Sequence, residues 1–226
     1  MPIIWIIFGI FMLISWAIGA QLKSKFKAYS KIPINNDLSG KDVAEKMLKD
    51  HGIYGVAVTS VPGDLTDHYD PVKKTVNLSK DVFYGQNVAS AAVAAHECGH
   101  AVQHANAYSF LQMRSSLVPV VSLASKWVQW ILLAGILLVQ SFPQILLLGI
   151  VLFALTTIFS FITLPVEIDA SKRALVWLNK SGLTTSETHP KAKDALDWAA
   201  YTYVVAALAS LATLIYYISV YMGRKD

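Results

Sequence analysis

The stretch His96-Glu97-Cys98-Gly99-His100 holds two histidines four positions apart, with a glutamate beside the first. It follows an alanine-rich run, residues 88–95, that favours helix. Because residues four apart lie on the same helix face, the two imidazoles can bind one metal ion. Glu97 would lie close enough to act on a water molecule at that metal. The H-E-x-x-H pattern is typical of zinc sites that hydrolyse peptide bonds.

The setting of the motif favours a metal site over a helix that merely carries two histidines. The string can arise by chance in a chain with six histidines. It lies in a mostly apolar segment, however, where burying unpaired His and Glu side chains costs free energy that a zinc ion would offset. Cys98, the only cysteine of the chain, lies off the His96/His100 face. We interpret it as a packing residue and expect no disulfide within the chain.

Composition places this motif in an integral membrane protein. Hydrophobic residues make up 54% of the 226 residues and charged residues 15%, against about 25% charged residues in soluble domains. The apolar residues are concentrated in blocks. The net charge is +4, but the basic residues lie beside these blocks, as in the cytoplasmic flanks of membrane helices. We therefore predict the lipid bilayer, and no nucleic acid, as a partner.

Four apolar segments are long enough to span a bilayer. A signal peptide is the alternative for the first, but no basic residue precedes it and no clear cleavage site follows it. Lys23, Lys25, Lys27 and Lys31 come directly after this segment and predict that residues 23–116 are cytoplasmic. Alternate crossings then place residues 165–197 on the same side and the C-terminus outside. The predicted spans are residues 3–22, a hairpin of 117–139 and 143–164, and 198–222.

Residues 23–116 are predicted to form a small α+β part that carries the metal helix. Ser39 or Asp37 could cap its first helix. Two β-rich segments follow, and a strand edge there could hold an extended peptide by main-chain hydrogen bonds. The predicted elements are a helix over Asn36–His51, strands over Gly52–Val61 and Lys74–Leu78, and the metal helix over Gln86–His104.

A catalytic zinc site needs a third protein ligand and an open position for water. His104 lies two helical turns beyond His96, too far to share one ion at a rise of about 1.5 Å per residue. Glu167 is the preferred candidate, because the hairpin returns the chain to the same membrane face and Glu167 opens a polar helix to Asn179. Asp169 is the rival ligand, or could accept a hydrogen bond from a ligand imidazole. Glu167 could also simply cap its helix, where the dipole favours it.

Three segments resemble the bacterial membrane zinc metallopeptidases of the YugP-like group. They are residues 96–101, residues 164–171 (Leu-Pro-Val-Glu-Ile-Asp-Ala-Ser) and residues 65–71, ahead of the metal helix. The resemblance covers nearly the whole chain, including the leading span and the hairpin. It implies a mainly α membrane protein with about four transmembrane helices and a small zincin-like (gluzincin) catalytic domain in the bacterial plasma membrane.

The chain is also similar to the heat-shock membrane proteases and the prenyl-protein endopeptidases. In those relatives the helix after the hairpin carries Glu-x-x-Ala-Asp, in which the Glu binds zinc and the Asp orients a ligand histidine. Glu167 and Ala170 match this pattern, but Ser171 stands in place of the Asp. Ser171 and Asp169 are therefore both candidates for the supporting position.

These observations predict an integral-membrane zinc metallopeptidase with Zn2+ bound by His96, His100 and Glu167. Glu97 is the predicted general base, and the substrate is a peptide or a membrane protein. His68 and Tyr69 are candidate donors to the oxyanion. A turn network formed by Asp67, His68 and Asp70 is the alternative interpretation.

Two other functions compete with this one. An intramembrane protease also uses H-E-x-x-H, but would need the motif inside a membrane span. A zinc-stabilised scaffold would need no general base and would usually close its site with four ligands. The sequence leaves the physiological substrate and the oligomeric state open.

Overall fold

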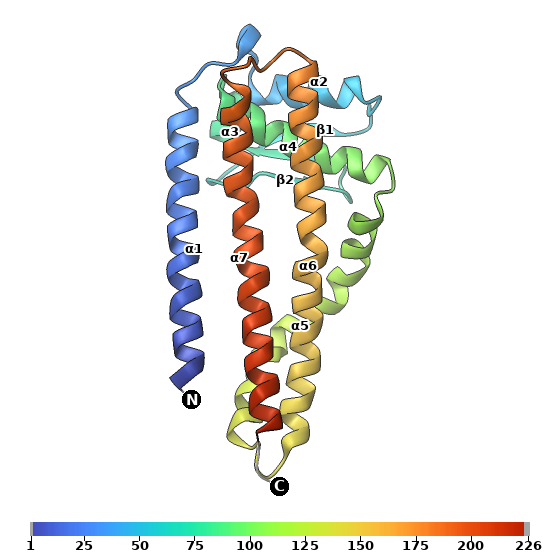
Figure 1. The fold of residues 1–226 in the computed structure, drawn as a ribbon. Coiled ribbons are helices and arrows are strands. Elements are labelled where there is room, and N and C mark those ends of the chain that lie inside the picture. Colours follow the sequence, from blue (N-terminus) through green and yellow to red (C-terminus); the bar gives the residue numbers. More distant parts are fainter. Residues whose placement is uncertain (1, 224–226) are drawn as a thin grey trace. The chain divides into compact units, whose positions relative to one another are not determined.

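The computed structural model describes residues 2–223 (Figure 1). The fold is mainly helical with one small sheet, which confirms the coarse expectation from the sequence. Its elements are α1 (Pro2–Tyr29), η1 (Asn35–Asp37), α2 (Gly40–Asp50), β1 (Ala57–Val61), β2 (His68–Asp70), β3 (Thr75–Ser79), α3 (Lys80–Tyr84), α4 (Val88–Ala105), α5 (Ser109–Leu137), α6 (Pro143–Lys180) and α7 (His189–Met222).

Four helices are long and apolar enough to cross a membrane, as predicted: α1, α5, α6 and α7. Their most apolar stretches have mean hydropathies of 2.4, 1.6, 2.7 and 1.9, in that order. Contacts divide the chain into two compact units. Unit 1 comprises Met1–Ala17, Gln112–Leu164 and Thr202–Asp226, and unit 2 comprises Ile18–Leu111 and Pro165–Tyr201.

In unit 1, α5 and α6 pack through small residues. A Cβ on Gly135 of α5 would lie 2.6 Å from the Cα of Leu146 on α6, so the two helix backbones are in close contact there. Leu132 and Leu146 are buried beside this contact. The charged Lys126, which interrupts the predicted second span, is exposed.

In unit 2, a capping box at Ser39 and Asp42 sets the start of α2. The Ser39 hydroxyl accepts from the Asp42 N–H and the Asp42 carboxylate accepts from the Ser39 N–H, a reciprocal capping box. Ser39 is therefore the cap, and the predicted start at Asn36 is wrong. Asn36 has φ 68° and Asp37 φ 50°, which no α-helix accommodates.

The sheet of unit 2 has the strand order β1-β3-β2, with β1 parallel and β2 antiparallel to β3. The strand predicted over 52–61 begins only at Ala57, and Gly52, with φ 70°, lies in the turn that follows α2. The second predicted strand is β3, shifted by one residue. Strand β2 was not predicted, because the Asp-rich segment around it has the composition of a turn.

Helix α6 joins two elements that the sequence predicts as separate. Pro165 lies inside it and, because proline lacks an N–H, donates no helical hydrogen bond. The third apolar segment and the polar helix from Glu167 are therefore one continuous helix. Helix α7 starts at His189 and continues without a break into the apolar segment predicted over 198–222.

Candidate metal centre

Helix α4 carries the H-E-x-x-H motif through the centre of unit 2. The side chain of Asn87 caps it by accepting from the Ser90 N–H at 2.9 Å. The helix is buried along almost its whole length and packs against α2, α3 and the sheet. A helix held on several sides presents its histidines in fixed positions.

Helix α6 passes close to the motif on α4 because both helices carry a small residue where they cross. A Cβ on Gly99 of α4 would lie 2.6 Å from the carbonyl oxygen of Ala170 and 3.0 Å from its Cα. Ala170 itself is fully buried. Three residues before Ala170, Glu167 therefore projects its carboxylate toward the histidines of α4.

Replacing Gly99 by alanine is expected to separate these two helices. The new methyl group would meet backbone atoms that cannot move out of the way as a flexible side chain would. We expect a loss of about 1–3 kcal/mol in stability, typical of overpacking, together with weaker zinc binding. Thermal unfolding and zinc titration of the purified protein measure both effects. Gly19→Ala is the matched control, since a Cβ at Gly19 meets nothing within 4 Å, and equal behaviour of the two variants would contradict the prediction.

His96, His100 and Glu167 form a group that could hold a metal ion. The Nε2 atoms of His96 and His100 lie 3.3 and 3.5 Å from Glu167 Oε2, and candidate ligand atoms of the three residues all lie within 4.8 Å of one another. Charge-assisted N–H···O bonds are usually about 2.7–2.9 Å long. The longer distances here match the edge of about 3.3 Å expected between ligands bound tetrahedrally about 2.0–2.1 Å from zinc. Two imidazole nitrogens and a carboxylate oxygen are also a donor set that suits zinc.

The far side of each ligand imidazole has a protein partner. Nδ1 of His100 lies 3.0 Å from Oε1 of Gln103, and Nδ1 of His96 lies 3.0 Å from the hydroxyl of Ser171. Both contacts leave Nε2 facing Glu167. Such partners fix the ring orientation of metal-binding histidines.

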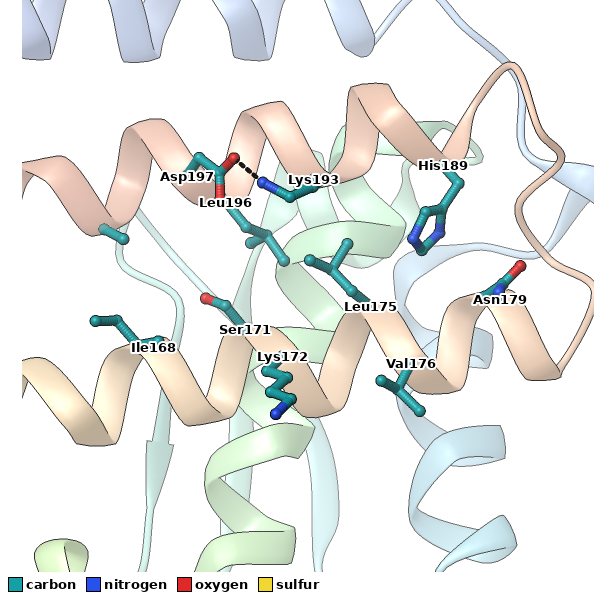
Figure 2. Close-up of a pocket in the computed structure, with 11 residues that line it drawn as sticks. Ile168, Ser171, Lys172, Leu175, Val176, Asn179, His189, Lys193, Leu196 and Asp197 are labelled. Atoms are coloured by element: carbon teal, nitrogen blue, oxygen red, sulfur yellow. Dashed lines mark hydrogen bonds and ion pairs between the residues drawn. The ribbon is translucent and has the colours of Figure 1, made fainter.

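Ser171 also lines a cavity of about 370 Å³ between α6 and α7 of unit 2. Figure 2 shows Ser171 and Leu175 of α6 facing Leu196 of α7 across it. The rim carries the Lys193–Asp197 ion pair. The structure thus places Ser171 between the cavity and His96.

Asp169 does not join the three candidate ligands. Its carboxylate accepts from the Nε2 of Gln103 at 2.8 Å and from Nε of Arg173 at 2.5 Å. It therefore reaches His100 only through Gln103. Gln103 was not singled out from the sequence. Its spacing from His100 places it on the same helix face, but its burial and its contacts with α6 are seen only in the structure.

Glu97 is buried beside the two histidines, with 8% of its surface exposed. Burial raises the pKa of its carboxyl group, against the opposing effect of His96 and His100. Cys98 lies on the opposite side, with its Sγ 3.5 Å from the carbonyl oxygen of Ala44 on α2. Burial raises the pKa of this thiol well above its usual value, as expected of a packing residue.

His68 and Tyr69, the candidate oxyanion donors, have other partners in the structure. Nδ1 of His68 donates to the carbonyl oxygen of Thr66 at 2.8 Å, and its Nε2 lies 3.2 Å from Nδ2 of Asn77. The hydroxyl of Tyr69 lies 2.9 Å from Nδ1 of His104. These contacts resemble the turn network that was the alternative interpretation, and they also give His104 a position outside the candidate ligand group.

Comparison with known proteins identifies the family of this chain. Residues 4–222 match a family model described as "Putative neutral zinc metallopeptidase". The chain belongs to this family. It is also 38% identical over 206 residues to the "Putative membrane protease YugP" of Bacillus subtilis (strain 168). This alignment covers 91% of each of the two chains. No solved structure shows a significant match.

Membership of the family confirms the resemblance predicted from the motif segments. The similarity to a membrane protease and the four apolar helices together indicate a membrane protein. The family description suggests zinc as the metal, and the group of His96, His100 and Glu167 could hold such an ion.

Proposed function

We propose that this protein is an integral-membrane zinc peptidase in which His96, His100 and Glu167 bind the metal and Glu97 is the general base. The observation that carries the proposal is the convergence of two Nε2 atoms and one carboxylate oxygen with a buried glutamate next to the first histidine. Three protein ligands leave a fourth position of a tetrahedral ion open for water.

A zinc ion at this position would lower the pKa of water in its open site toward about 7 and polarise the scissile carbonyl. Glu97 would take a proton from the attacking water and deliver it to the leaving amine nitrogen. Burial suits this role, because a raised pKa makes a carboxylate a stronger base.

The substrate would be a peptide or a membrane protein bound in extended form. Strand β2 lies at an edge of the sheet, and α4 packs against it. An extended chain could pair with such an edge by main-chain hydrogen bonds, which read no particular side chain. This arrangement would bring a peptide bond toward the helix that carries His96 and His100.

We propose that the protein crosses the membrane several times and that the site faces the cytoplasm. Lys23 and Lys27 are exposed near the end of α1, and Lys31 is exposed just beyond it. Basic residues next to a span favour the cytoplasmic side. These lysines and the metal centre belong to the same unit 2.

The two competing functions have less support. An intramembrane protease would carry the motif on a spanning helix, whereas α4 is not among the four candidate spans found in residues 2–223. A scaffold site would usually bind zinc with four protein ligands. The group described around His96 contains three.

Removing the metal is the direct test of this function. The full-length protein, purified in detergent and loaded with zinc, should hydrolyse a fluorogenic peptide or casein. 1,10-Phenanthroline should abolish hydrolysis, and added zinc should restore it, with close to one zinc per chain by elemental analysis. The 1,7-isomer, which does not chelate, serves as the control. Undiminished hydrolysis by zinc-free protein would overturn the proposal.

A further inference from the structure

Gln103 is fully buried, although it carries a primary amide, and this amide bridges the two helices that form the metal centre. From α4, its Nε2 lies 2.8 Å from the carbonyl oxygen of Val166 and 2.8 Å from Oδ2 of Asp169, both on α6. Its Oε1 lies 3.0 Å from Nδ1 of His100. Both the NH2 group and the oxygen of the amide therefore have partners.

The partners of Gln103 fix the direction of its amide. A carbonyl oxygen and a carboxylate oxygen only accept hydrogen bonds, so the group that faces Val166 and Asp169 must be the NH2. The oxygen is left for His100, whose Nδ1 must then carry the hydrogen. This tautomer leaves the lone pair of the His100 imidazole on Nε2, the atom that faces Glu167.

The other end of the bridge is braced as well. Arg173 donates from Nε to Asp169 at 2.5 Å, and its guanidinium lies 5.8 Å from the ring centroid of Tyr108. The Tyr108 N–H donates to the carbonyl oxygen of Gln103 at 2.9 Å. Asp169 is thus held by the cation of Arg173, one turn further along α6. Arg173 in turn contacts Tyr108, whose N–H is bonded to Gln103 near the end of α4.

We propose that Gln103 is a positioning residue with two separable tasks. Its side-chain oxygen sets the tautomer of His100 for metal binding. Its NH2 group fixes the position of α6 along its own axis, so that the Glu167 carboxylate lies next to the two histidines. The inference rests on the proposed zinc site and adds to it.

Three variants separate the tasks. Gln103→Met keeps the approximate volume but removes both the acceptor and the donor. Gln103→Glu keeps an acceptor for His100 but places a second carboxylate against Asp169. The double variant Gln103→Glu/Asp169→Asn exchanges the amide and the acid. The new amide at position 169 can then donate to the new carboxylate at position 103, while its oxygen still accepts from Arg173.

The readouts are cobalt or zinc affinity, the visible d–d spectrum of the cobalt form, and the thermal unfolding of the metal-free protein in detergent. We expect Gln103→Met to weaken metal binding by about 10–100-fold, the range found for lost outer partners of ligands, and to alter the cobalt spectrum. Gln103→Glu keeps an acceptor for His100 but should also bind the metal less tightly and unfold at a lower temperature, because its carboxylate repels Asp169 and no longer holds α6 in place. The double variant should recover part of both the affinity and the unfolding temperature, because it restores the contact with position 169 but not the one with the Val166 carbonyl oxygen.

Asn77→Leu is the matched control for a purely structural effect. Asn77 is a buried amide of unit 2 with its own hydrogen bonds, to Thr59 and Thr75 among others. Its replacement should lower the unfolding temperature without changing the metal affinity or the cobalt spectrum.

Unchanged metal affinity in Gln103→Met would overturn this inference alone, provided that the original protein binds the metal. An original protein that takes up neither cobalt nor zinc would overturn the proposed metal centre itself. If Gln103→Met fails to fold, Gln103→Glu and the double variant decide. Unchanged metal affinity in Gln103→Glu, or no gain in affinity when Asp169→Asn is added to it, would contradict the positioning role.

Discussion

Replacing Glu97 by glutamine is expected to abolish peptide hydrolysis while zinc stays bound. The substitution keeps the shape of the side chain but removes the base that would take the proton of the attacking water. General acid–base catalysis contributes about 10²–10⁴-fold, so turnover should fall by at least that range. His96, His100 and Glu167 remain intact in this variant, and one zinc per chain should still be found by elemental analysis.

Glu45→Gln is the matched control for this experiment. Glu45 lies on α2 in an exposed ion pair with Lys41, and its loss should change neither activity nor zinc content. Full activity in Glu97→Gln would rule out the proposed mechanism. Loss of zinc together with activity would instead show that Glu97 supports the metal centre.

Replacing Glu167 by glutamine is expected to remove the metal itself. A neutral amide oxygen is a poor zinc ligand, and its NH2 group would face the two histidines. The loss in zinc affinity should exceed the roughly 10–100-fold that outer partners of ligands contribute, because Glu167 would contact the ion directly. Isothermal titration with zinc and hydrolysis of the same fluorogenic peptide give the two measurements.

Asp169→Asn separates the two acidic candidates on α6. Its side-chain oxygen can still accept from Arg173 or from Gln103, so zinc should remain bound. If Asp169→Asn loses zinc and Glu167→Gln keeps it, the ligand assignment is reversed.

The local part of the site could be predicted from sequence because helix periodicity is local. The spacing of His96 and His100 alone brings both imidazoles to one face of α4. The placement of Glu167 required a further step, the return of the chain through the apolar hairpin. The structure brings these three residues together, as that step predicts.

The remaining features depend on contacts that no spacing reveals. The role of Gln103 depends on the point along α6 at which it crosses α4. The close approach of Gly99 and Ala170 determines this point. Strand β2 forms because His68 to Asp70 pairs with β3, a pairing that the turn-like composition of this segment conceals. The continuity of α6 through Pro165 was missed because proline favours a helix boundary, a preference that tertiary packing can override.

The burial of Cys98 has a practical consequence for reagents that modify thiols. It is the only cysteine of the chain, it is fully buried, and its sulfur faces the backbone of Ala44. The natural protein should therefore react only weakly with maleimide reagents. A single cysteine introduced at Lys31 or at Gln140 would be the main reactive thiol, and an impermeant maleimide applied to intact cells would report on which side of the membrane each position lies.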